Sequence, residues 1–141
     1  MTEAIFALLQ KVGYTHPLHP PLTHIPMGMV MGCFFFGLLA WKANKTELSR
    51  TALHCSILAI IFIIPTIFAG ILDWQHRYGG SYTPLIIIKM ILAPTLTGLL
   101  GYAIWLNRQN APPKKLFIVY ALCLVCAGGL GFSGGQLVYG G

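Results

Sequence analysis

The chain has 141 residues, of which 56% are hydrophobic and only 9% carry a charge, and its mean hydropathy is +0.73. A soluble domain has about 25% charged residues, so this composition excludes a soluble protein and indicates an integral membrane protein. The net charge of +6 does not indicate nucleic-acid binding, because the basic residues fall mainly in short segments between apolar runs, where they orient a membrane protein.

Residues 1–24 are expected to lie outside the membrane or at its surface. Apolar residues spaced through positions 5–12 predict a short amphipathic helix that lies on the membrane or against a partner. The stretch from His16 to Pro26 then holds three of the five histidines and four of the nine prolines.

Those prolines predict where the first membrane helix begins. Proline fixes the backbone and removes an amide donor, so we expect residues 16–21 to be extended. Proline is tolerated in the first turn of a helix, which predicts a helix start at Pro26 with Thr23 as a candidate N-cap.

Four apolar runs predict a transmembrane domain over residues 25–141. The expected spans cover about residues 25–41, 52–72, 84–106 and 116–132. Pro65 and Pro94 fall inside the second and third spans, where a membrane helix accommodates proline as a kink. Short connections favour an all-α, up-and-down four-helix bundle.

The basic residues predict the orientation of this bundle. The segments 42–51 and 107–115 together hold six lysines and arginines, whereas the N-terminal segment has Lys11 and the segment 73–83 has Arg77. The positive-inside rule therefore places the two basic segments in the cytoplasm and both termini on the extracytoplasmic side.

In this topology, polar side chains from different spans gather at the outer end. His19 and His24 lie at the start of the first span, Asp73 and His76 follow the second, and Lys89 lies within the third. Scattered solvation does not sort polar groups to one face, so the pattern predicts an outward-facing site.

Two of these residues also have simpler interpretations. Lys89 is costly, because a charge at the centre of a membrane helix costs about 2.5–3.5 kcal/mol, yet its side chain can extend outward to the interface. His76 beside Arg77 is also typical of a solvated loop.

Soft ligands form a separate group. Cys123 and Cys126 lie three residues apart on one helix face and could bind a soft metal, although core packing explains buried thiols more simply. Met27 and Met31 follow His24 and would suit copper(I), but methionine also fills helix interfaces.

Three motifs resemble a family of small bacterial four-helix membrane proteins catalogued as a domain of unknown function. The family opens its first helix with a His-Pro-x-x-Val-His-Phe-Pro type sequence, which corresponds here to residues 19–26. It ends its second helix with Gly-x-x-Asp, here residues 70–73, and closes with Gly-Gly-x-Leu-Val-Tyr, here residues 134–139.

This resemblance, over residues 19–141, implies a multi-pass protein of the bacterial inner membrane. Its relatives are often fused to or encoded beside cytochrome c or Rieske modules, which implies a redox setting. They also tend to carry a histidine near the outer start of the third helix, where this chain has Lys89. If that histidine ligates haem in relatives, this protein uses lysine there or binds no haem at that position.

We therefore expect a membrane subunit of an electron-transfer complex that holds a b-type haem or a quinone near the outer face. His24 is the preferred haem ligand or quinone hydrogen-bond partner, because imidazole is a standard axial ligand. His19, His76 and Lys89 compete for the second position, and Asp73 is expected to balance the lysine charge.

The chain has too little mass outside the membrane for us to expect an enzyme acting alone. Its expected partners are membrane lipid and other membrane or periplasmic redox subunits, such as a cytochrome c or a Rieske protein. One alternative is a cofactor-free structural or assembly subunit whose outer histidines dock an extracytoplasmic redox protein. A weaker alternative is copper handling through His19, His24, Met27 and Met31.

Overall fold

The computed structural model describes residues 1–16 and 18–139, and these residues form helices and short connections without any strand. The helices are α1 (Thr2–Lys11), α2 (His19–Ala43), α3 (Thr46–Arg77), α4 (Pro84–Arg108) and α5 (Pro113–Tyr139). Within the described chain, α2 to α5 are the four helices that are long and apolar enough to cross a membrane. The prediction of an all-α, four-helix membrane protein is thus confirmed.

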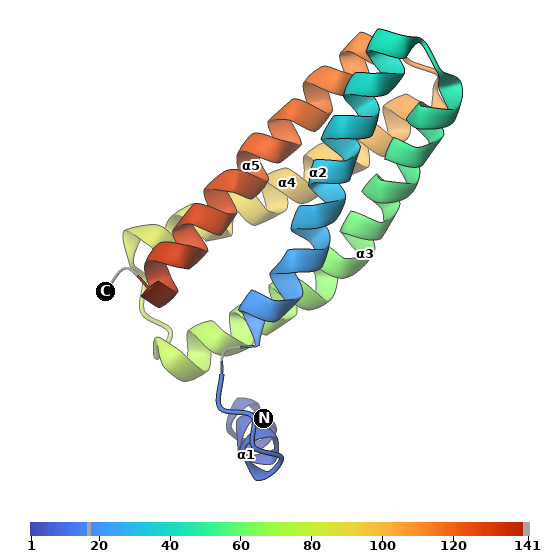
Figure 1. Ribbon diagram of the computed structural model, residues 1–141. Helices are drawn as coiled ribbons and strands as arrows, with labels where there is room; N and C mark the ends of the chain where they lie inside the picture. Colours follow the sequence, from blue (N-terminus) through green and yellow to red (C-terminus); the bar gives the residue numbers. More distant parts are fainter. Residues whose placement is uncertain (17, 140–141) are drawn as a thin grey trace.

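The four long helices form an up-and-down ring. Helix α2 packs mainly on α3 and α4 mainly on α5, and contacts between α2 and α5 and between α3 and α4 close the ring. Both termini lie at one end of the bundle (Figure 1). We call this the terminal end, and we call the opposite end, formed by residues 42–50 and 107–115, the basic end.

Small residues hold the helices close together in the half of the bundle near the basic end. Cys33, Ala52, Ala59, Ala103 and Cys123 are all completely buried there. Toward the terminal end, the α2–α3 pair diverges from the α4–α5 pair (Figure 1). The bundle is therefore tight at one end and spread at the other.

The closest approach of α2 and α5 depends on a glycine. A Cβ atom added at Gly37 of α2 would lie 2.5 Å from Cδ2 of the Tyr120 ring on α5, and that ring is only 1% exposed. An added methyl group cannot fit there unless the ring moves. Gly37 thus sets the distance between the two helices.

The predicted start of the first membrane helix was wrong. Helix α2 begins at His19, so residues 19–21 are helical rather than extended, and Pro26 and Thr23 lie inside the helix. Pro20 is tolerated because it falls in the first turn, where backbone amides have no intrahelical partner. Proline does occupy the first turn of the helix, as expected, but the proline concerned is Pro20 and not Pro26.

The other helices also extend beyond their apolar runs. Helix α3 continues to Arg77, so Asp73 and His76 lie in its last turns and not in the following loop. Hydropathy marks only the part of a helix that crosses hydrocarbon, whereas the backbone continues as a helix into the polar flanks.

We expect Gly37→Ala to lower the free energy of unfolding in detergent by about 1–3 kcal/mol, as overpacking does in well-packed cores. The matched control is Gly98→Ala on α4, where an added Cβ meets nothing within 4 Å. Alanine has the better helix propensity, so the control should be neutral or slightly stabilising. Equal effects of the two changes would contradict the close contact of Gly37 with Tyr120.

The orientation predicted from the basic residues can be tested by labelling single introduced cysteines in intact cells. Ser81→Cys lies in the α3–α4 loop at the terminal end and Gln109→Cys at the basic end, and both positions are exposed. A membrane-impermeant maleimide should label residue 81 and not residue 109, with the wild-type chain as background control. The reverse pattern would place the terminal end in the cytoplasm.

Candidate functional site

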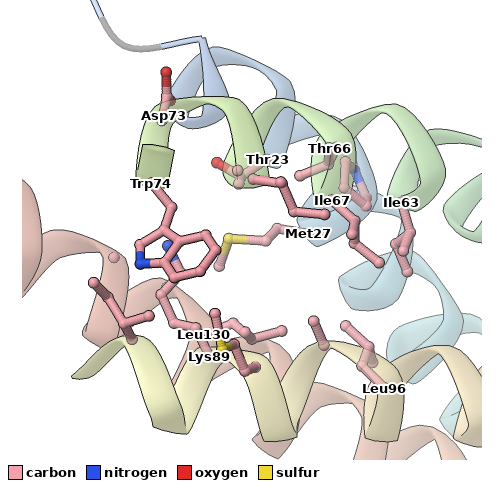
Figure 2. Close-up of a pocket in the computed structure, with 18 of the residues that line it drawn as sticks. Thr23, Met27, Ile63, Thr66, Ile67, Asp73, Trp74, Lys89, Leu96 and Leu130 are labelled. Carbon is pink, nitrogen blue, oxygen red and sulfur yellow. The ribbon is translucent and has the colours of Figure 1, made fainter. Parts of the chain in front are cut away.

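A cavity of about 560 Å³ lies between the four long helices in the terminal half of the bundle. Ligand pockets have volumes of about 300–1,000 Å³, so its size suits a small molecule. Most of its lining is apolar, with Ile63 and Ile67 from α3, Leu96 from α4 and Leu130 from α5 (Figure 2).

Glycines on α5 leave space for this cavity. Gly131, Gly134 and Gly135 line it. A Cβ atom at Gly131 would come within 2.8 Å of Cε of Met27, and one at Gly134 would lie 3.7 Å from Nζ of Lys89. Side chains from α2 and α4 therefore reach across to the bare backbone of α5.

Lys89 supplies the only ammonium group among the described residues that line the cavity. Its side chain is partly buried, and its Nζ lies near Gly134. The negative charge of Asp73 acts on this ammonium group from a distance. The lysine predicted from the sequence is thus inside a cavity, beside the backbone of α5.

Asp73 lies on the opposite side of the cavity and is 5% exposed. The backbone amide of Leu18, the N-cap residue of α2, donates a 3.1 Å hydrogen bond to its Oδ1. Figure 2 shows the carboxylate pointing away from Lys89. Asp73 therefore anchors the start of α2, where a negative charge is favoured by the helix dipole, in addition to its longer-range effect on the lysine.

Trp74 follows Asp73, and its indole ring projects into the cavity (Figure 2). Its Nε1 donates a 2.7 Å hydrogen bond to the carbonyl of Ser81, and its ring lies 5.3 Å from that of Tyr82. The loop holds the polar edge of the indole, which leaves its apolar surface for the cavity. Our sequence prediction did not include Trp74, although a tryptophan at a helix end is typical of the membrane interface.

His24 is also at this site. It lies on α2, lines the cavity and is exposed, so it forms part of the rim and not of the floor. Nearby, Thr66 of α3 donates to the carbonyl of Leu22 over 3.3 Å, which ties α3 to the first turns of α2. The structure thus brings His24, Asp73 and Lys89 together around one cavity.

His76 is in a different place. Its ring stacks on Phe6 of α1, with centroids 3.9 Å apart and an interplanar angle of 7°. Its Nδ1 lies 3.3 Å from a carboxylate oxygen of Glu3. His76 is not among the described residues that line the cavity, and its contacts attach α1 to the end of α3.

The remaining predicted ligands are distributed elsewhere. His19 begins α2, but its side chain lies outside the described part of the structure. Met27 lines the cavity, whereas Met31 is 49% exposed on the outer surface of α2. Among the described residues, no three His, Cys, Asp or Glu side chains are grouped to hold a metal ion.

Cys123 and Cys126 of α5 are not among the described residues that line the cavity. Cys123 is completely buried, and Cys126 packs against the same apolar core. This arrangement agrees with the interpretation of Cys123 as a core residue.

A family described as "Predicted membrane protein (DUF2231)" matches residues 15–141. The chain belongs to this family. No curated protein and no solved structure was found to match the DUF2231 chain. The match includes all four long helices and therefore the whole cavity.

The attachment of α1 through Phe6 can be tested by hydrogen exchange. Phe6 is 6% exposed, whereas Leu8 on the same helix is 66% exposed. We expect Phe6→Ala to speed amide exchange in residues 2–11 by about tenfold or more, because it removes about 1.5–3 kcal/mol of burial. Leu8→Ala, the control, should change it little. Equal protection in both variants would contradict the role of the Phe6–His76 stack.

Proposed function

We propose that this DUF2231 protein is a membrane subunit of a bacterial electron-transfer complex and that its cavity binds a quinone. The observation that carries the proposal is a single ammonium group, Lys89, in an otherwise mainly apolar cavity within a membrane bundle. An ammonium group in that setting is expensive. A ligand with an apolar body and hydrogen-bond acceptors would offset the cost.

The shape of the cavity supports a ligand that arrives through the lipid. Ile71 of α3 and Met90 of α4 line the cavity and are 46% and 41% exposed. A quinone dissolved in the bilayer would enter between these two helices, without crossing water.

The polar groups of the cavity support this proposal. Lys89 would donate to one carbonyl oxygen, and His24 at the rim would be the partner of the other. The indole of Trp74 offers a flat apolar surface for the ring, since aromatic rings favour offset stacking. Bound in this way, the quinone would supply the electron and proton transfer, and the protein would orient it.

A b-type haem is the second candidate. His24 and Lys89 line the same cavity from α2 and α4, helices that face each other across the ring. If a haem were bound, His24 and Lys89 would hold its iron, the lysine as its neutral amine. His76 is less suited, because its ring is stacked on Phe6.

Partners follow from the same proposal. A protein of this size would exchange electrons with a membrane or extracytoplasmic subunit, for which a cytochrome c or a Rieske protein is the expected type. The bacterial inner membrane is the proposed location. Leu8 on α1 and Val12 just after it are apolar and are 66% and 78% exposed, which would suit contact with lipid or such a subunit.

Co-purification tests the proposal directly. The protein is purified in mild detergent, its bound lipids are extracted, and quinone is measured per mole of protein. Lys89→Met should lower the quinone content by about tenfold or more, because a hydrogen bond to a charged group stabilises by about 1.5–3 kcal/mol. Lys115→Met, an equal change of charge at the exposed basic end, is the control and should retain quinone.

An absorption spectrum of the same sample separates the candidates. A Soret band that His24→Ala abolishes and His54→Ala leaves unchanged would identify haem; His54 is an exposed residue of α3 outside the described cavity lining. Wild-type protein with neither quinone nor a visible band would sink both cofactor proposals and favour a docking subunit without a cofactor.

A further inference from the structure

A second cavity, of about 430 Å³, lies at the basic end of the bundle. It is formed where the α2–α3 connection meets the α4–α5 connection, and its lining is far more polar than that of the first cavity. It shares no lining residue with the first cavity among those described. A ligand bound in this second cavity would therefore occupy a site separate from that of the proposed quinone.

The lining of this second cavity is positively charged. Lys45 and Arg50 line it, and no acidic side chain is among its described lining residues. Glu47 lies between them in the sequence but is exposed outside that lining. A cavity with two cations and no carboxylate attracts an anion.

Backbone groups add to this positive potential. Helix α3 begins at Thr46, which lines the cavity, and no side chain caps its N-terminus by a hydrogen bond. Its first amides therefore lack the side-chain acceptor that usually satisfies them. Helix α5 begins at Pro113, which lines the same cavity. Two positive helix ends thus meet at one place.

The walls of the cavity are held in position by asparagines. Asn107 of α4 donates from Nδ2 to the carbonyl and to Oγ of Ser49 on α3, at 3.1 Å and 3.2 Å. Asn44 and Asn110 have left-handed backbones, with φ of 56° and 54°, and line the cavity just beyond the ends of α2 and α4. These residues turn the chain sharply, so that both connections fold over the same space.

We infer that this cavity binds a phosphate group, namely the headgroup phosphate of an anionic membrane lipid. Lys45 and Arg50 would neutralise the phosphate, with the free amides of the first turn of α3 as additional donors. The cavity lies at the ends of membrane-length helices, where headgroups are located. Apolar residues, including Ala40, Leu53 and Leu116, line it beside the charges and would contact the glycerol and upper acyl chain.

The test is native mass spectrometry of the full-length protein in mild detergent with equal amounts of phosphatidylglycerol and phosphatidylcholine. The wild-type protein should retain phosphatidylglycerol selectively. The double variant Lys45→Gln/Arg50→Gln should lose this selectivity by about tenfold or more, as expected for two basic contacts. The matched control Lys114→Gln/Lys115→Gln removes the same charge from α5 residues that are exposed outside the described lining.

Equal loss in the two double variants, or no preference for phosphatidylglycerol in the wild type, would overturn the inference. A separate arm adds inorganic phosphate. A second outcome of this arm is that millimolar phosphate displaces the lipid and raises the thermal stability of the wild type but not of Lys45→Gln/Arg50→Gln. In that case the cavity is a phosphate site, and its ligand is soluble phosphate instead of a lipid headgroup. Circular dichroism of each variant, with a wild-type helical spectrum as the criterion, ensures that folded proteins are compared.

Discussion

The close contact of Gly37 with the Tyr120 ring holds α2 against α5, and the arrangement of the rest of the bundle depends on it. Small or fully buried side chains fill the half near the basic end, including Cys33, Ala52 and Ala103. Within lipid there is little hydrophobic drive to bring helices together, so association relies on such close packing. Because only one half is packed in this way, the helices diverge in the other half (Figure 1), where glycines of α5 line the cavity. The ligand-sized cavity is a consequence of this uneven packing.

The two ends of the bundle differ in the surroundings of their charged side chains. At the basic end, exposed lysines and arginines are in contact with water and cost little. At the terminal end, Lys89 lies inside a mainly apolar cavity, and Asp73 acts on it only at a distance, because the carboxylate is engaged by the amide of Leu18. The cost of a charge in such a setting is the observation on which the proposed quinone site rests.

Much of the architecture could be predicted from the sequence, because it depends on local patterns. The number and type of the membrane helices follow from four apolar runs, and Lys89 stood out because charge is rare in such runs. The partners of individual side chains could not be predicted in the same way. The stacking of His76 on Phe6 and the bond from Leu18 to Asp73 join residues far apart in the chain, and no spacing rule encodes them. The start of α2 at His19 was missed because proline has two opposite meanings near a helix, breaker or first-turn residue.

Long-range contacts also link the N-terminal segment to residues that line the first cavity. Arg77 lines the cavity and donates from Nη2 to the carbonyl of Thr15 over 2.8 Å, while Asp73 holds the amide of Leu18. Two residues of the connection between α1 and α2, Thr15 and Leu18, are thus tied to α3 side chains that belong to the cavity lining. Helix α1 itself is attached by the stacking of Phe6 on His76, which lies between Asp73 and Arg77 in the sequence of α3. The N-terminal segment is therefore attached to α3 beside the cavity, at the end of the bundle opposite the tightly packed half.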